Sequence, residues 1–296
     1  MIVTEERNTL LKLIFITPCV VEDFFLPVKK AAAMAAEIFG VSVEFVGTED
    51  VDIEEQVGLI EKALAEGYDG IALSMPHDKA FNDIVARALA KNVPVVAFNV
   101  DSKDPANKRL AAVAQNLFEA GRAAGLRAAR HIRTGAKVLF TQHSENVSAL
   151  DDRMSGMLES LQNKNIRHEV IITGMFAREA GEVITRKLQD DEGISAILCT
   201  GQADTEGAGL AKASFPNREL FVAGFDLSSG ILEMVQQGVI DFTVEQQPFA
   251  QGFYPVAQLV LYLRYGIAPM NMDTGAAIID TENVGSAMKA VAEGFR

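Results

Sequence analysis

The sequence lacks a surplus of basic residues and lacks any long apolar run. Its 27 Lys and Arg residues are outnumbered by 40 Asp and Glu residues, which sets the net charge at −13. Because nucleic-acid binding neutralises phosphates with clustered Lys and Arg, this balance predicts no nucleic-acid partner. No apolar stretch approaches the roughly 18 residues that span a bilayer, so we expect no transmembrane helix.

Cysteine is also scarce, because Cys19 and Cys199 are the only two in the chain. Each follows a predicted strand, and the two strands lie in different halves of the sequence. A disulfide would therefore have to join the two halves. We expect two buried, unpaired thiols instead.

The motifs that carry catalysis are missing as well. The chain has neither a Gly-x-Ser-x-Gly turn nor a Walker loop, and the glycine-rich stretch 201–209 has the wrong spacing for dinucleotide binding. The four histidines lack metal-ligand spacing: His77, His131, His143 and His168. Because no acid, base and nucleophile come together, we predict no enzyme, no cofactor and no bound metal.

What the sequence does contain is a regular alternation of strands and helices. An apolar run at 10–16 precedes an Ala-rich helical segment at 24–39, which Asp23 could cap, and a further helix is predicted over 78–91. This order is typical of parallel sheets covered on both faces, so the predicted fold class is α/β. The length suits two domains, and the absence of a Gly/Ser linker favours more than one crossing between them.

The two halves of the chain repeat one pattern at the ends of their strands. Phe98-Asn99 and Phe225-Asp226 each close an apolar run, and their phenylalanines are 127 residues apart. The preceding apolar runs contain Ile71 and Ile197, which are 126 residues apart. Open parallel sheets bind ligands at the carboxyl ends of their strands. The repeat therefore predicts two similar α/β halves that face each other across a cleft.

Several stretches, in order between about Leu11 and Val284, resemble the ribose-binding type of sugar-binding proteins from bacterial ABC importers. That family has the type I periplasmic binding fold. The stretches that carry the resemblance are 22–25 (Glu-Asp-Phe-Phe), 93–101, Asn116 with Gly121-Arg122, 148–153, Phe176, 224–226 (Gly-Phe-Asp) and 246–248 (Gln-Gln-Pro).

The resemblance implies two Rossmann-like lobes with parallel sheets, joined by a three-crossing hinge that closes on a ligand. The N-terminal lobe would comprise residues 1–113 and 248–273. The C-terminal lobe would comprise residues 114–247 and 274–296. Three crossings would also account for the missing linker.

The resemblance also implies a ligand site, in which aromatic rings pack on the ligand and polar groups bind its hydroxyls. The implied ligand-binding residues are Glu22, Phe24, Phe25, Asn99, Asp101, Arg153, Phe176, Gln202, Asp226 and Gln246. Without the resemblance, Phe24 and Phe25 could be core residues, and Arg153 could lie on a solvated face. Asp101 could cap a turn and Asp226 a helix, and Asp204 is interpreted as a helix cap.

Three departures from the ribose pattern bear on the ligand. Asn99-Val100 stands where ribose binders have Asp-Arg, so one of two expected arginines is missing. Glu22 stands where the family often has Asn, and Gly201-Gln202 stands where Asn-Asp is expected. Glu22 and Asp101 would add acid to the site, and a buried acid without a cationic partner is costly. We therefore expect a neutral or cationic ligand other than ribose: a sugar, a polyol or an amino sugar.

The resulting hypothesis is a monomeric solute-binding protein that delivers a monosaccharide or polyol to the membrane permease of an ABC importer. We expect it in the periplasm, and residues 1–7 are too acidic to begin a signal peptide, which would be absent from this sequence. One alternative is the effector domain of a LacI-type regulator, which would need a DNA-binding helix-turn-helix. Others are a small sugar enzyme, or a carrier for an amino sugar or a furanone-like signal.

Overall fold

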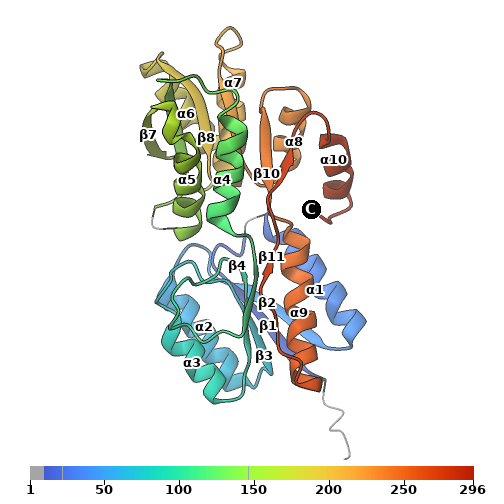
Figure 1. Ribbon diagram of the computed structural model, residues 1–296. Helices are drawn as coiled ribbons and strands as arrows, with labels where there is room; N and C mark the ends of the chain where they lie inside the picture. The colour runs from blue at the N-terminus through green and yellow to red at the C-terminus, as the bar shows by residue number, and fades with distance from the viewer. Residues whose placement is uncertain (1–9, 22, 146) are drawn as a thin grey trace, which may run out of the picture. The chain divides into compact units, whose positions relative to one another are not determined.

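The computed structural model describes residues 10–296 apart from positions 22 and 146, and it divides into two compact units (Figure 1). Unit 1 contains the described residues up to Ala114 together with Phe249–Met272. Unit 2 contains Gln115–Pro248 and Asp273–Arg296. The chain thus passes from one unit to the other three times. The expected lobe boundaries lie one residue from each crossing; that the units close on a ligand stays a prediction.

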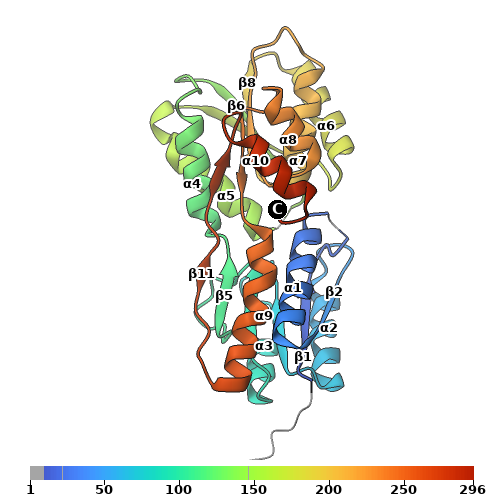
Figure 2. The ribbon, with the colours of Figure 1, turned by 90° about the vertical axis from the view of Figure 1, so that its right-hand side faces the viewer.

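Unit 1 is built on a six-stranded sheet with helices on both faces. Neighbouring strands from β5 to β2 are parallel. The strands follow the order β11 (Met272–Asp273), β5 (Ala111–Ala114), β4 (Val95–Asn99), β3 (Gly70–Leu73), β1 (Lys12–Thr17) and β2 (Ser42–Gly47). Helices α1 (Phe25–Phe39) and α9 (Pro248–Tyr265) lie side by side (Figure 2) and pack on one face, while α2 (Ile53–Glu66) and α3 (Asn82–Ala90) pack on the other.

Unit 2 repeats this plan with a second six-stranded sheet, parallel except for its last strand, β12, which is antiparallel to β10. The order is β12 (Ala277–Ile279), β10 (Phe242–Glu245), β9 (Phe221–Phe225), β8 (Ile194–Cys199), β6 (Lys137–Gln142) and β7 (Arg167–Ile172). Helices α4 (Leu117–Ala128) and α5 (Ser148–Leu161) cover one face. The other face carries α6 (Ala177–Asp190), α7 (Gln202–Ala213), α8 (Ser229–Gln236) and α10 (Val284–Ala292). A short 3-10 turn, η1, spans Gln162–Lys164.

The expected fold class is therefore confirmed: both sheets are mostly parallel and both are flanked by helices. The strand residues explain why, because side chains alternate between the two faces and both sets are apolar. In β1, Leu13 and Phe15 enter one core and Ile14 and Ile16 the other. Both cysteines are buried and neither forms a disulfide, as expected.

Two local expectations are wrong. The side chain of Asp23 does not cap α1, which starts after Phe24 without a side-chain cap. The backbone carbonyl of Asp23 accepts a hydrogen bond from the Leu26 amide. Helix α3 starts at Asn82 rather than at position 78. His77 Nδ1 instead accepts hydrogen bonds from two backbone amides just after it, and Asp78 Oδ1 accepts one from the Lys103 amide. These bonds hold the segment in a turn.

Helices α4 and α5 pack closely because glycines line their contact. A Cβ atom on Gly121 would overlap the carbonyl oxygen of Arg153, and one on Gly156 would overlap that of Phe118. No other residue type allows the two backbones to approach so closely. This contact fixes the position of α5, and with it the side chain of Arg153.

We predict that Gly121→Ala destabilises the protein, because the added methyl group must push α5 away from α4. The expected loss of unfolding free energy is about 2 kcal/mol, typical of overpacking. Gly58→Ala on α2 is the matched control, since nothing lies within 4 Å of its Cβ position. That variant should gain roughly 0.5–1 kcal/mol from better helix propensity. Urea unfolding measures both, and equal stability of the two variants would contradict the prediction.

Candidate functional site

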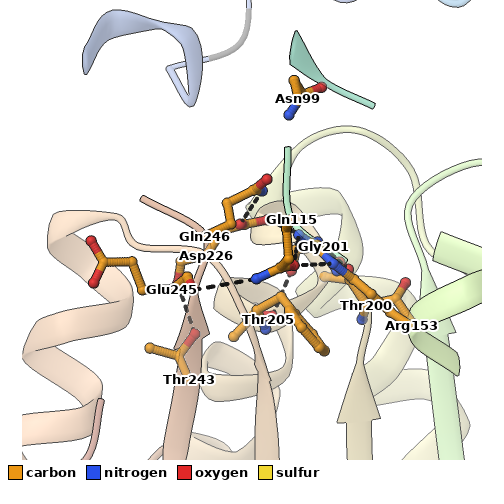
Figure 3. A network of polar contacts seen from close by, with 12 residues as sticks. Asn99, Gln115, Arg153, Thr200, Gly201, Thr205, Asp226, Thr243, Glu245 and Gln246 are labelled. Atoms are coloured by element: carbon orange, nitrogen blue, oxygen red, sulfur yellow. Dashed lines mark hydrogen bonds and ion pairs between the residues drawn. The ribbon is translucent and has the colours of Figure 1, made fainter. Parts of the chain in front are cut away.

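Polar residues follow three neighbouring strands of the unit 2 sheet, at its carboxyl edge (Figure 3). Thr200 follows β8, Asp226 follows β9 and Gln246 follows β10. Asp226 has a left-handed backbone with φ of 70°, and Asn99, its counterpart in unit 1, has φ of 61°. Asn and Asp tolerate this conformation better than other non-glycine residues. The repeat seen in the sequence is thus a repeat of backbone geometry.

Arg153 is the centre of this group and is only 3% exposed. Its Nη1 donates to the Thr200 carbonyl at 2.8 Å and to Asp226 Oδ2 at 3.3 Å. Its Nε and Nη2 both donate to Gln115 Oε1, at 3.2 and 2.9 Å. The guanidinium carbon lies 4.3 Å from the centre of the Phe225 ring, which adds a cation–π contact. Arg153 therefore does not lie on a solvated helix face, which was the alternative to a ligand-binding role; its contact with a ligand stays a prediction.

Asp226 is the counter-ion of Arg153 and is 6% exposed. Its Oδ1 accepts a hydrogen bond from Gln246 Nε2 at 2.6 Å, and its carbonyl accepts one from Thr243 Oγ1 at 2.7 Å. The carboxylate is thus held by two side chains from different elements. A buried ion pair with this many hydrogen bonds is rigid, and removing one partner would leave the other charge unpaired. Asp226 does not cap α8, because Ser228 does so.

A second buried carboxylate, that of Glu245, points away from this group (Figure 3) and pairs with Arg296 at 3.2 Å between Nε and Oε1. Burial raises the pKa of Glu245, and the positive charge of Arg296 opposes that rise. Each acid of the cluster therefore has its own arginine.

Gln115 belongs to the same cluster, although the sequence analysis did not select it. It directly follows the buried run of β5, as Asn99 and Asp226 follow theirs, so the same strand-end rule could have found it. Its amide group hydrogen-bonds Arg153 through the oxygen and two backbone carbonyls through the nitrogen.

Beneath the cluster, the fully buried Asp204 fixes the turn that carries Thr200. Its carboxylate accepts hydrogen bonds from the amides of Thr200 and Gly201, at 2.8 and 2.9 Å, and from Thr141 Oγ1 at 2.8 Å. The interpretation of Asp204 as a helix cap is confirmed, because these bonds lie at the start of α7. Burial raises the pKa of Asp204 to about 7, against the opposing effect of its hydrogen bonds.

His143 lies in the loop after β6, beside Gly201. A Cβ atom built on Gly201 would lie 2.9 Å from the imidazole ring of His143. Burial lowers the pKa of His143 to about 4; the charge of Asp226 opposes this and that of Arg153 adds to it. The imidazole is therefore neutral at pH 7 and adds no charge next to the cluster.

In unit 1, the predicted polar residues have local partners. Asn99 accepts a hydrogen bond from Ser74 Oγ at 3.2 Å and donates to Gln251 Oε1 at 3.5 Å. Asp101 forms a bidentate ion pair with Arg109. The expectation that Asp101 adds an acid without a cationic partner is therefore wrong, because that partner comes from the polar connection after β4. A ligand contact for Asn99 or Asp101 stays a prediction.

The three predicted aromatic residues differ in exposure. Phe25 is buried in the core of unit 1, with its ring centre 6.0 Å from that of Phe45 and 6.5 Å from that of Phe98. Phe24 is half-buried, whereas Phe176, just before α6, is 73% exposed. Contact of any of these rings with a ligand stays a prediction.

The remaining predicted residues are Gln202 and Glu22. Gln202 is the half-buried first residue of α7. Glu22 lies outside the described residues. In the part of the chain that the structure describes, no three acidic, His or Cys side chains gather as metal ligands. Within the same described residues, no helix is both long and apolar enough to cross a membrane.

Residues 13–267 match the family described as periplasmic binding protein domain. A xylose/arabinose-binding protein from Sulfolobus acidocaldarius is 25% identical over 289 residues, which cover 92% of this chain and 72% of that protein. A D-ribose/D-allose-binding protein from Pseudomonas aeruginosa is 21% identical over 88% of this chain and 85% of its own.

Solved structures resemble the chain over nearly its whole length. A periplasmic sugar-binding protein of an ABC sugar transporter from Legionella pneumophila superposes with a TM-score of 0.83 at 25% identity, covering 89% of this chain and 99% of that one. A carbohydrate transporter protein from Acidothermus cellulolyticus, solved with myo-inositol, has a TM-score of 0.87 at 24% identity. It covers 97% of this chain and 100% of its own, and shows the shared fold.

The raised pKa of Asp204 predicts a pH-dependent stability. Its folded pKa of about 7 exceeds the ordinary value of 3.8, so its stabilising contribution is complete below pH 4 and is lost as pH rises towards 7. Asp204→Asn removes this titration. We therefore expect the unfolding free energy of the variant, relative to the native chain, to improve steadily between pH 4 and 7.

Urea unfolding at several pH values measures the difference in unfolding free energy between Asp204→Asn and the native chain. Contributions from other titrating groups are present in both proteins and therefore cancel in this difference. His143 is one of these groups. Because its pKa is lowered to about 4, its contribution to the stability of the protein is lost as pH falls from 6.5 to about 4, whereas that of Asp204 is lost as pH rises. A constant difference between variant and native chain across this range would show that Asp204 ionises normally.

Proposed function

Because the chain belongs to the periplasmic binding protein domain family, we propose that it is the solute-binding component of an ABC importer. In this role it binds a monosaccharide or polyol and presents it to a membrane permease. The family consists of binding proteins, so the chain holds its solute without transforming it, and it is not an enzyme. Its place of action would be the periplasm or the equivalent space outside the membrane.

The observation that carries this proposal is the rigid polar cluster at the carboxyl edge of the unit 2 sheet. Arg153, Asp226 and Gln246 offer donors and acceptors in fixed directions, which suits ligands whose hydroxyl groups both donate and accept. Opposite charges in the cluster cancel, so a neutral ligand meets strong hydrogen-bonding groups without bringing an uncompensated charge.

The relatives support the class of ligand. Proteins named for xylose and arabinose or for ribose and allose are similar over most of this chain, and a structure with the same fold holds myo-inositol. Small neutral rings with several hydroxyl groups are common to all of them. The family match also favours a solute-binding protein over the regulator alternative. In this proposal the two units are the lobes that close on the ring.

A panel of matched ligands tests the function and its charge preference together. We expect a neutral pentose, hexose or cyclic polyol to raise the melting temperature, because a ligand at about 100 times its Kd adds about 2.7 kcal/mol to stability. Because Asp101 and Asp226 are paired with arginines, we expect neutral ligands rather than amino sugars.

The sharpest comparison uses a hexose, its amino sugar and its uronate in calorimetric titrations. Both charged analogues should bind at least about tenfold more weakly than the neutral sugar, because Asp101 and Asp226, the described acids of the predicted site, are already paired with arginines. Tight uronate binding would show that the charge argument is wrong. If no sugar or polyol in the panel binds, the proposed function fails.

A ligand contact for Phe176 predicts a loss of affinity without a loss of stability. Replacing this exposed ring by Ala removes little core packing, so the melting temperature of the ligand-free protein should stay unchanged. Sugar affinity should fall roughly tenfold if the ring packs on the ligand. Tyr265→Ala is the control, since Tyr265 is similarly exposed, at 69%, at the end of α9. Unchanged affinity in Phe176→Ala would exclude the contact.

A further inference from the structure

Gln115 is the first residue of unit 2, and all of its side-chain hydrogen-bonding capacity is used (Figure 3). Oε1 accepts two hydrogen bonds from Arg153, and Nε2 donates to the carbonyls of Glu245 and Gly275, at 3.3 and 2.8 Å. A primary amide can accept two and donate two hydrogen bonds, so the group is saturated while being almost fully buried.

The backbone partners of Gln115 lie beside the other two points where the chain crosses between the units. Glu245 ends β10, three residues before the chain leaves the unit after Pro248, and Gly275 lies two residues after the chain returns at Asp273. One side chain therefore holds together, inside unit 2, the ends of all three crossings. Asp273 Oδ1 supports this junction by accepting from the amides of Asn116 and Gly275, at 3.1 and 2.9 Å.

We propose that Gln115 is a positioning residue that couples the guanidinium of Arg153 to the three crossing segments. The inference rests on the proposed function, because it assumes that Arg153 binds the ligand and concerns how the crossing segments set the position of its guanidinium. A shift of any crossing segment moves the Gln115 nitrogen, and the planar amide carries that shift to the oxygen that orients Arg153. Arg153 in turn holds Asp226 and the Thr200 turn.

Only an amide satisfies both sides of this junction. A carboxylate at position 115 would still accept from Arg153, but would place a second acceptor against the carbonyls of Glu245 and Gly275. An apolar side chain would leave both Arg153 and the carbonyls without this partner. Gln115→Glu therefore removes only the bonds to the two carbonyls, whereas Gln115→Leu removes these bonds and the bonds from Arg153.

The test measures hydrogen exchange by NMR in the ligand-free protein. In Gln115→Glu, exchange at the amides of Asn116 and Gly275 should become about tenfold faster, while the Arg153 Nε–H stays protected. In Gln115→Leu, all three groups should exchange faster. Gln258→Leu is the control: it removes a buried glutamine that also bonds backbone groups, those of Met270 in unit 1, and should leave the three groups unchanged.

Sugar affinity provides a second readout, which should fall more in Gln115→Leu than in Gln115→Glu, because only the first releases Arg153. Native exchange at Asn116 and Gly275 in Gln115→Glu would overturn the proposal. So would a protected Arg153 Nε–H in Gln115→Leu. If the native chain binds no sugar, the proposed function fails, and the exchange measurements still decide the role of Gln115.

Discussion

The ion pair between Arg153 and Asp226 is the interaction on which the rest of unit 2 depends. Both side chains are buried, and a buried charge is tolerated only when its partner and its hydrogen bonds are in place. The structure meets this demand from every side: Gln115, Thr200 and Gln246 supply hydrogen bonds, and Phe225 supplies a ring. The glycine contact between α4 and α5 brings the helix of Arg153 close enough for these bonds to form.

The two units share one plan but differ in charge at the corresponding strand ends. Ser74 and Asn99 in unit 1 correspond by position to Thr200 and Asp226 in unit 2, and Asn99 repeats the left-handed backbone of Asp226. Unit 1 thus offers neutral amide and hydroxyl groups at this position, whereas unit 2 holds a compensated charge pair. Among the described residues, neither unit presents an unbalanced charge at this strand end.

Much of this could be predicted from the sequence, because it depends on local periodicity and on strand ends. The parallel sheets follow from apolar runs buried on both faces, and Asn99 and Asp226 follow from their places at strand ends, whereas Gln246 followed from the family resemblance alone. The side-chain partners of these polar residues could not be predicted from the sequence, because they come from other elements of the fold. Asp101 finds Arg109 in a polar connection, and Arg153 finds Gln115 and Asp226 from other elements. The motif Phe24-Phe25 could not show which ring enters the core, because two adjacent rings at a helix start differ only in direction.

The most direct test of the central claim is a double-mutant cycle on the ion pair, with Arg153→Met and Asp226→Asn. Asn suits the left-handed backbone of position 226, so the single variants report the loss of charge rather than strain. Each single variant should lose about 3–5 kcal/mol of unfolding free energy, because it leaves a buried charge unpaired. The double variant should recover only part of that stability, because no buried charge stays unpaired but Gln115 Oε1 and the Thr200 carbonyl still lose their donor, and it should bind the sugar at least about tenfold more weakly than the native chain. A double variant that is stable and binds with native affinity would contradict the account, because the ion pair would then serve only the fold.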